Sequence, residues 1–439
     1  MTYLLLVLLI ILLLFNLKLN RNDIIAPAVL FTFSFVISAF FAALYVGKWE
    51  LFLHKNTFYV IIFGVLEFSV VCAFIHFIVT FFRHSSYLRE AWRPKIITIS
   101  RIKLLIFAAF EILTIFYSIY AVVKLYHGSL LHFTDSINQY RNQNLFGNEK
   151  LSLPRLVTYL RLSVEAGGYW FGYILVNNYF LTKKINVYLL TVVMLSAISS
   201  YIMGGRTGMI NIIVALGCSW FIISNKSRNF RNLLKFKTLV SILLIGIIVL
   251  SCFESLAFLI GRGGYEGASG LDYLAIYIGA PIKNLDTFLQ GNIYVNNIFE
   301  SQTFINLMNG IGPKFHLIQH SIMLDLPFQR VGIYSLGNVY TTFYAFIYDF
   351  GYNGVWILVL IMAIISQMVY ETVRSSYKVT SPAYSSLVYS YIATALVMSF
   401  FSNRFYEQIF NLSFIKIIII WMLFKLIFIK VVFDRKEIK

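Results

Sequence analysis

Long apolar segments recur along nearly the whole 439-residue chain, and they constrain the fold more than any other feature of the sequence. The chain is 59% hydrophobic and only 13% charged, which leaves too few polar side chains to cover a water-soluble protein of this size. The apolar runs are continuous, whereas a membrane barrel strand shows only about ten residues of alternating polarity. We therefore expect an all-α polytopic integral membrane protein.

The apolar runs predict about 11 transmembrane helices. They cover residues 2–15, 24–46, 57–82, 104–127, 155–181, 186–203, 208–223, 238–260, 354–371, 383–402 and 409–431. Most of them are long enough for about 30 Å of hydrocarbon at about 1.5 Å per residue. The first and the seventh fall short of that length, and the sixth and the ninth lie near the lower limit. The first run has no basic n-region and no cleavage site, so we expect it to be retained.

The loops fall into two groups that alternate along the chain. The loops 16–23, 83–103, 182–185, 224–237, 372–382 and 432–439 hold 20 Lys and Arg against four acidic residues. The loops 47–56, 128–153, 204–207, 261–353 and 403–408 hold ten residues of each sign. Because basic loops stay in the cytoplasm, the pattern predicts an external N terminus and a cytoplasmic C terminus. The net charge of +17 is then a topology signal, and nucleic-acid binding is not needed to explain it.

Two predicted external segments, 128–153 and 261–353, are too long to be simple connections. In the second, residues 272–289 are expected to form an aromatic-rich interfacial helix broken at Gly279-Ala280-Pro281. Residues 338–348 are expected as a separate interfacial or re-entrant helix, because a continuous span would put Asp349 inside hydrocarbon. No internal repeat or low-complexity linker divides the chain, so residues 1–439 are expected to form one membrane domain.

A turn of about four residues between the sixth and seventh spans, Gly-Gly-Arg-Thr at 204–207, holds Arg206 between two apolar segments. Its guanidinium has five donors that suit phosphate or carboxylate in a bidentate geometry, although an interfacial arginine also binds lipid headgroups. Arg262, Arg330 and Arg404 place three more guanidiniums on this face. For Arg330 lipid anchoring is the preferred interpretation. Together the four arginines suit an anionic site such as a lipid pyrophosphate.

Ionisable residues also occur inside the predicted spans, where they are costly and tend to face the interior of a bundle. Arg161 and Glu165 lie one turn apart in the fifth span, so they share a helical face. They predict either a mutual ion pair or a substrate channel. Glu67 and His76 in the third span are nine residues apart, and we expect a structural role for them rather than a proton relay.

The external face offers several candidates for a general base: His316, His320, Glu266, Asp272 and Asp286. We prefer His316, because an unperturbed imidazole titrates near neutral pH. The sequence has no P-loop, no HExxH, no Cys/His cluster and no external Asp-x-Asp. We therefore expect no metal, no cofactor and no ATP-driven pump within this chain. The three cysteines lie in apolar runs, so they do not indicate a disulfide.

Several short motifs follow one another along the predicted outer face. They are GGRTGMI at 204–210, YIGAPIKNLD at 277–286 and GNVY at 337–340, followed by YDFG at 348–351. With the span count and the late external loop, they resemble the O-antigen and oligosaccharide repeat-unit polymerases of the Wzy type. An Arg-x10-Gly pattern associated with that family matches Arg206 and Gly217, although Gly217 falls in a span. Arg262 and Arg330 have no glycine at that spacing.

The resemblance implies transfer of a glycan from undecaprenyl diphosphate to another lipid-linked repeat unit, on the outer face of a bacterial cytoplasmic membrane. It implies a GT-C-like, metal-independent glycosyltransferase. We assign the catalytic roles to Arg206, Arg262 and His316, and substrate contacts to Arg161, Glu165, Asp286, Arg330, Asn338 and Arg404. Expected partners are undecaprenyl-diphosphate-linked oligosaccharides, membrane lipids, a repeat-unit flippase and a chain-length regulator, with no nucleic acid. The alternatives are an O-antigen ligase-like transferase and a lipid-linked oligosaccharide flippase.

Overall fold

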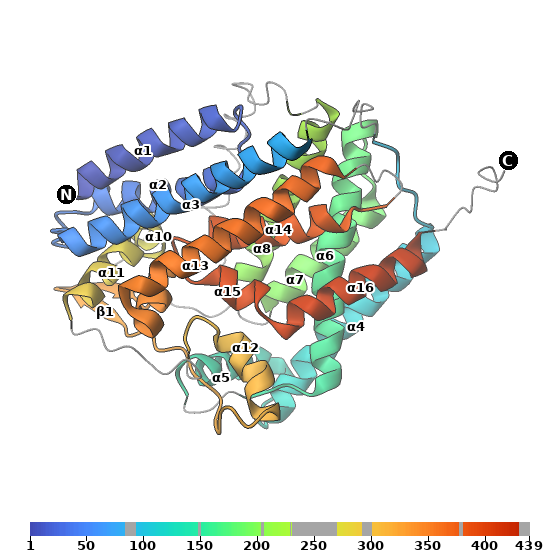
Figure 1. The fold of residues 1–439 in the computed structure, drawn as a ribbon. Helices are drawn as coiled ribbons and strands as arrows, with labels where there is room; N and C mark the ends of the chain where they lie inside the picture. Colours follow the sequence, from blue (N-terminus) through green and yellow to red (C-terminus); the bar gives the residue numbers. More distant parts are fainter. Residues whose placement is uncertain are drawn as a thin grey trace.

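The computed structural model describes residues 1–83, 94–147, 151–202, 206–228, 230, 270–291, 301–376 and 381–429. Within these ranges it contains 15 α-helices, two short 3-10 helices and one two-stranded antiparallel hairpin (Figure 1). The prediction of an all-α architecture is confirmed for this part of the chain, with the small hairpin as an addition.

Ten of the helices coincide with ten of the expected spans, and the eighth expected span, 238–260, lies outside the described residues. Six described helices are long and apolar enough to cross a membrane, and α7 and α14 are shorter apolar helices. The chain is therefore a multi-pass membrane protein. The ten helices are α1 (Thr2–Leu19), α2 (Pro27–Leu44), α3 (Lys55–Arg83), α4 (Arg101–Leu125), α6 (Arg155–Thr182), α7 (Val187–Ile202), α8 (Arg206–Ser227), α13 (Thr342–Ser375), α14 (Tyr384–Val397) and α16 (Leu412–Phe428).

The tenth predicted span, 383–402, is too long, because α14 ends at Val397, and two other predicted spans are too short. The first span was expected to end at residue 15, but α1 has 18 residues, and the seventh was expected at 208–223, but α8 has 22 residues. In both cases the helix continues past the apolar run into polar residues. Asn16 of α1 is buried, and its side-chain amide donates to the hydroxyls of Thr32 and Ser69 at 2.9 Å each. Because other helices satisfy its donors, this polar residue does not end the helix.

The shorter elements gather at one end of the long helices. Figure 1 shows α10, α11 and β1 at the left together with the N terminus and α5 and α12 at the bottom, whereas α15 lies nearer the centre, in contact with α12. All of them belong to the loop group without net charge, so their position agrees with the predicted alternation of loops. They are η1 (Leu130–His132), α5 (Phe133–Phe146), α10 (Leu271–Ile278), α11 (Ala280–Gln290), α12 (Ile305–Ile311), η3 (Gly312–Lys314), β1 (Gln329–Val331), β2 (Tyr334–Gly337) and α15 (Arg404–Ile409).

Both predicted helix breaks are confirmed. The backbone breaks between α10 and α11 at Gly279, just before Pro281 in the first turn of α11. Helix α13 is kinked at Gly351, where φ is 64° and ψ is −164°, so a short arm precedes the long one. Asp349 lies in the short arm, buried in protein, and accepts hydrogen bonds from the Ser301 hydroxyl at 2.6 Å and the Thr303 N–H at 2.6 Å. These donors compensate its burial.

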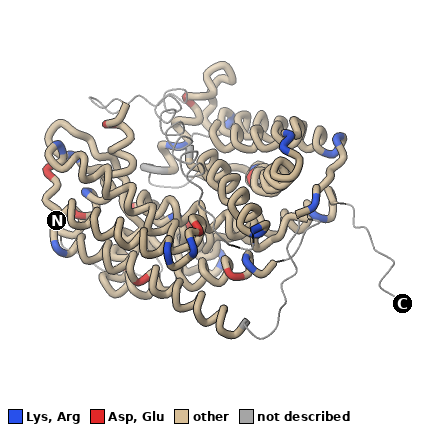
Figure 2. Tube along the Cα trace, turned by 90° about the horizontal axis from the view of Figure 1, so that it is seen from above, with Lys and Arg blue, Asp and Glu red and all other residues tan. Residues whose placement is uncertain are grey.

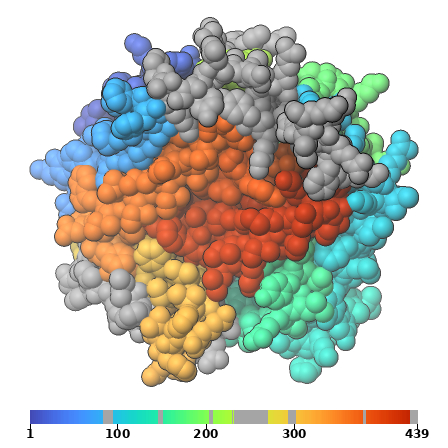
Figure 3. Space-filling view, turned by 45° about the vertical axis from the view of Figure 1, so that its right-hand side comes forward, coloured from blue at the N-terminus to red at the C-terminus, as the bar shows by residue number. Residues whose placement is uncertain are grey.

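The helices form two bundles that share α14. The first bundle buries apolar side chains of α1, α2, α3 and α13, and the second buries those of α4, α6, α7, α8 and α16. Helix α14 supplies Ile392 and Leu396 to the first core, and Leu387 and Tyr391 to the second. In Figure 3 the orange and red surface of α13 to α16 is continuous between α3, in blue, and α4, in cyan. The bundles therefore pack as one body.

Large apolar side chains also cover the outer faces of the long helices. A water-soluble protein rarely exposes apolar surface of this extent, whereas lipid tails would cover it. Figure 2 shows few charged residues along the helices, in agreement with this. Examples of outward-facing side chains are Phe63, Val70, Phe74 and Phe77 of α3 and Ile102, Leu105, Leu113 and Phe116 of α4.

Candidate functional site

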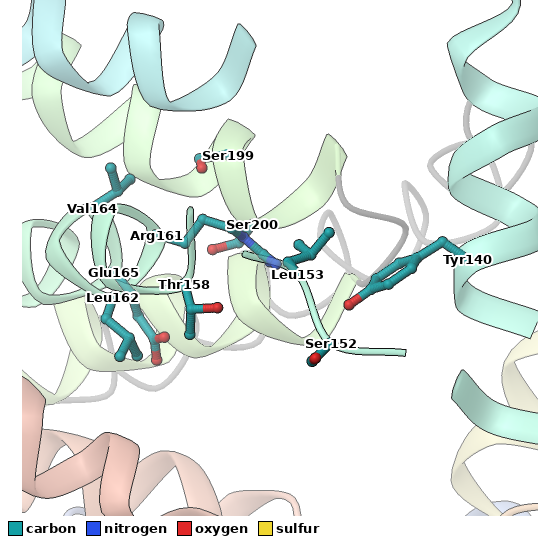
Figure 4. A pocket seen from close by; sticks show the side chains of 10 residues that line it. All are labelled: Tyr140, Ser152, Leu153, Thr158, Arg161, Leu162, Val164, Glu165, Ser199 and Ser200. Atoms are coloured by element: carbon teal, nitrogen blue, oxygen red, sulfur yellow. The ribbon is translucent and has the colours of Figure 1, made fainter. Parts of the chain in front are cut away.

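A polar cavity of about 340 Å³ lies at the first turns of α6 (Figure 4). Thr158, Arg161 and Glu165 follow one another every three or four residues, with Leu162 next to Arg161, so one face of α6 forms the largest part of its lining. The described residues that line it are Tyr140 of α5, Ser152 and Leu153 of the segment before α6, Thr158, Arg161, Leu162, Val164 and Glu165 of α6, and Ser199 and Ser200 of α7.

A small apolar core holds the outer wall of this cavity in place. Val122 of α4, Ile137 of α5 and Val157 of α6 are buried against Leu153. The segment between α5 and α6 is also tied by a hydrogen bond of 2.8 Å from the backbone N–H of Leu151 to Oδ1 of Asn144. Helix α5, which belongs to a predicted external loop, is therefore packed onto the bundle.

Among the described residues that line the cavity Arg161 is the only cation, and it forms no hydrogen bond or ion pair with any of the residues that the structure describes. Its side chain is half-buried and lines the cavity. In Figure 4 the side chain extends from α6 past Ser200 toward Leu153, and Tyr140 lies across the opening. An unpaired guanidinium in a largely apolar bundle favours the binding of an anion.

Glu165 occupies the next turn of α6. Its Oε1 accepts a hydrogen bond from the Tyr391 hydroxyl at 3.2 Å. The ring of Tyr391 packs against Tyr169 and Phe414, with centroid distances of 5.1 and 4.9 Å. The ion pair between Arg161 and Glu165, one of the two expectations from the sequence, does not form within the described structure, because the two side chains point apart (Figure 4).

Helix α8 begins at Arg206, close to the rim of the cavity. A Cβ atom added at Gly208 would lie 2.7 Å from Cβ of Ser200, so the first turn of α8 can approach α7 this closely only with glycine at 208. Ser200 lines the cavity, which places the first turn of α8 beside it. The Arg206 side chain and residues 203–205 are outside the part of the chain that the structure describes.

Four of the other predicted site residues do not line the cavity. His316 is exposed in the turn after η3, with a φ of 54°, and Arg330 is exposed in β1. Asn338 is half-buried directly after β2. Nη1 of Arg404, the first residue of α15, lies 3.2 Å from Oε2 of Glu407, so its charge is paired.

Asp286 was expected to contact substrate, but its carboxylate is fully buried and engaged by protein. It accepts hydrogen bonds from the Thr57 hydroxyl at 2.6 Å and from the backbone N–H of His54 at 2.9 Å. Nδ1 of His54 lies 3.0 Å from its second oxygen. Because α3 begins at Lys55, Asp286 caps the start of α3 and joins α11 to it. A carboxylate with these contacts is not open to a substrate.

Arg262 and Glu266 lie outside the described residues, so the structure does not place them. His76 is separate from Glu67, as expected, and its Nδ1 lies 2.6 Å from Oε1 of Glu371. This contact joins α3 to α13, which agrees with the structural role expected for His76.

Sequence reasoning missed Tyr140, Ser200 and Tyr391. Tyr391 is 226 residues from Glu165 in the chain, and no sequence spacing relates the two. Thr158 did carry a signal, because it lies three residues before Arg161 on the same helical face.

Comparison of the chain with models of protein families, with curated proteins and with solved structures finds no match. An assignment of function therefore depends on the cavity and on the sequence motifs.

Proposed function

We propose that this protein polymerises undecaprenyl-diphosphate-linked oligosaccharide repeat units into a surface polysaccharide. The observation that carries the proposal is the unpaired Arg161 in a polar cavity, beside the first turn of the helix that begins with Arg206. The motif GGRTGMI at this helix start is part of the resemblance to Wzy-type polymerases. Two independent features, one from the sequence and one from the structure, thus point to the same place.

The proposed orientation puts this cavity on the external face of a bacterial cytoplasmic membrane, in a GT-C-like bundle of about 11 spans. The described parts of the loops without net charge lie at the cavity end of the long helices, and the described loops of the basic group lie at the other end. A lipid-linked donor would then keep its hydrocarbon chain in the membrane and present its diphosphate and sugars at the cavity.

In this reaction the bond between the anomeric carbon and the diphosphate breaks, and negative charge develops on the leaving diphosphate. Cationic donors aimed at that charge stabilise the transition state. Arg161 lines the cavity, and the backbone of Arg206 begins the helix whose first turn lies beside it, so we assign this role to both. The hydroxyls of Thr158, Ser200 and Tyr140 supply hydrogen-bond partners for sugar hydroxyls.

The test uses purified protein and undecaprenyl-diphosphate-linked repeat units extracted from a strain that lacks this protein. Wild type should form a ladder of polymers. Arg161→Gln should lower turnover on the order of 10²–10³-fold, because it removes a charge-stabilising donor. Arg155→Gln is the matched control, since Arg155 is exposed at the start of the same helix and does not line the cavity. A normal ladder from Arg161→Gln would contradict the proposed site.

The same assay separates the alternative functions. Lipid-linked units that cross vesicle membranes without chain growth would indicate a flippase. Transfer to an acceptor other than a repeat unit, with no ladder, would indicate a ligase-like transferase.

A further inference from the structure

We infer that Glu165 is the general base that takes the proton of the attacking sugar hydroxyl, an inference that rests on the proposed function. It follows from one juxtaposition: the carboxylate of Glu165, with a described partner for only one of its oxygens, lines the same cavity as a guanidinium that no described residue pairs. In this inference Arg161 stabilises the leaving diphosphate and Glu165 takes the proton of the attacking hydroxyl in the same reaction.

The hydrogen-bond pattern of Glu165 suits a base. Its Oε1 accepts from Tyr391, whereas no described residue donates to its Oε2. The half-buried side chain lines the cavity, so Oε2 is the oxygen left for a substrate hydroxyl. Tyr391 is itself fixed between two aromatic rings, so the hydrogen bond holds the carboxylate in one orientation.

No other described residue of the cavity lining can serve as the base at neutral pH. Arginine stays protonated, and the hydroxyls of serine, threonine and tyrosine keep their protons. The external histidines, His316 and His320, are exposed and do not line this cavity. Glu111 is fully buried, and its Oε1 accepts a hydrogen bond from Ser196 at 2.6 Å, so it does not reach the cavity either.

The position of the two groups fits a displacement at the anomeric carbon. When the hydroxyl oxygen bonds to that carbon, its proton passes to Oε2 of Glu165, and the bond from the carbon to the diphosphate oxygen breaks. The electron pair leaves with the diphosphate, whose charge Arg161 stabilises, and Glu165 later releases the proton to water. Because the side chains of Arg161 and Glu165 point apart, reacting atoms can lie between the cation and the base (Figure 4).

The experiment measures the pH dependence of polymer formation by purified variants. Glu165→Gln preserves the shape of the side chain and an acceptor for Tyr391, but removes the base. Turnover should fall about 10²–10⁴-fold, and the loss of rate toward acidic pH should disappear. Binding of the lipid-linked unit should be unchanged. Glu67→Gln is the matched control, because it removes a carboxylate from α3 that does not line the cavity.

Two further variants distinguish a base from a structural carboxylate. Glu165→Asp should recover part of the turnover and keep the loss of rate toward acidic pH. This variant provides the same test if Glu165→Gln does not fold. Tyr391→Phe should cause a smaller loss of turnover and shift the pH at which the rate falls toward acid, since Tyr391 only positions the carboxylate.

The possible results separate this inference from the proposed function. Wild type that forms no polymer would contradict the proposed function itself. If wild type forms polymer and Glu165→Gln keeps both the wild-type rate and the loss of rate toward acidic pH, the inference about Glu165 is wrong and the proposed polymerase function stands. Equal inactivity of Glu165→Gln and Glu165→Asp, with weaker binding of the lipid-linked unit in both, would make Glu165 a binding residue and overturn the inference.

Discussion

At the scale of a single residue, substitution of Arg206 tests whether the anion is bound through the bidentate geometry of the guanidinium as well as through its charge. Arg206→Lys keeps the charge but loses the bidentate fork, so polymer should fall sharply while the protein still inserts in the membrane. Arg206→Ala should lower turnover on the order of 10²–10³-fold. Arg330→Lys should cost much less, because Arg330 is exposed in the hairpin. The measurement is polymer length at equal amounts of membrane protein. Normal length with lysine at 206 would favour lipid anchoring instead.

A second residue-scale prediction concerns Asp272, which accepts hydrogen bonds from the Tyr45 hydroxyl at 2.6 Å and from Nζ of Lys48 at 3.0 Å. These two hydrogen bonds hold the pKa of Asp272 below its usual value. The pKa of Asp272 is lower in the folded chain than in the unfolded chain, where it is about 3.9. The two hydrogen bonds therefore stabilise the folded state fully above pH values of about 3.9, and this stabilisation is lost as the pH falls through the folded-state pKa.

Asp272→Asn should therefore unfold at a lower temperature than wild type at neutral pH, and the difference should vanish in acid. The measurement is the thermal unfolding midpoint of purified protein across this pH range. Asp135→Asn, which changes an exposed carboxylate of α5, is the control. A difference that does not change with pH would contradict the prediction.

At the scale of one element, the kink of α13 requires glycine. Gly351 has a φ of 64°, so Gly351→Ala should destabilise the fold by about 1–3 kcal/mol. Gly217→Ala is the matched control: Gly217 lies inside α8, and no described atom lies within 4 Å of an added Cβ. It should be neutral or stabilise by up to about 1 kcal/mol. Denaturant unfolding checks both, and equal effects would contradict the role of the kink.

The Arg-x10-Gly match also belongs to this scale. Since nothing described approaches Gly217, the structure gives no steric reason for glycine eleven residues after Arg206. Gly217→Ala should therefore leave polymer length unchanged. Shortened polymer in this variant would show that the spacing has a functional meaning.

The sidedness of the elements is a prediction that labelling of single cysteines can check. Ile333, in the turn of the β1–β2 hairpin, and Lys184, between α6 and α7, are both exposed and lie in loops of opposite groups. In a cysteine-free background, Ile333→Cys should react with an impermeant reagent from outside, and Lys184→Cys only after permeabilisation. The reverse pattern would overturn the topology and the external position of the cavity.

For the whole molecule, the expected reaction needs neither a nucleotide nor a divalent metal. The donor already carries its leaving group on a lipid, and the sequence has neither a P-loop nor an external Asp-x-Asp. Purified protein should therefore form polymer without ATP and with a chelator present, whereas Arg206→Ala and Arg161→Gln should lower turnover in the same buffer. Turnover that a chelator abolishes would contradict this mechanism.

The sequence by itself determined the helices and their alternation. Long apolar runs must satisfy their backbone hydrogen bonds within one segment in lipid, so they become helices, and the basic loops separate from the neutral ones. The breaks at Pro281 and Gly351 were also predictable, because they depend on local backbone chemistry. The ends of α1 and α8 were not, since polar residues there are satisfied by other helices or continue the helix past the apolar run.

Only the tertiary structure decided which polar residues are engaged and which are open. Asp286 and Glu165 are both acidic residues that the sequence offers to a substrate. Packing buries Asp286 against His54, 232 residues away, and leaves Glu165 at the cavity with a described partner for only one of its oxygens. The same packing brings Tyr140 and Ser200 to the cavity of Arg161, whose guanidinium no described residue pairs. The availability of a polar group depends on neighbours that are distant in the chain, and no local pattern carries that information.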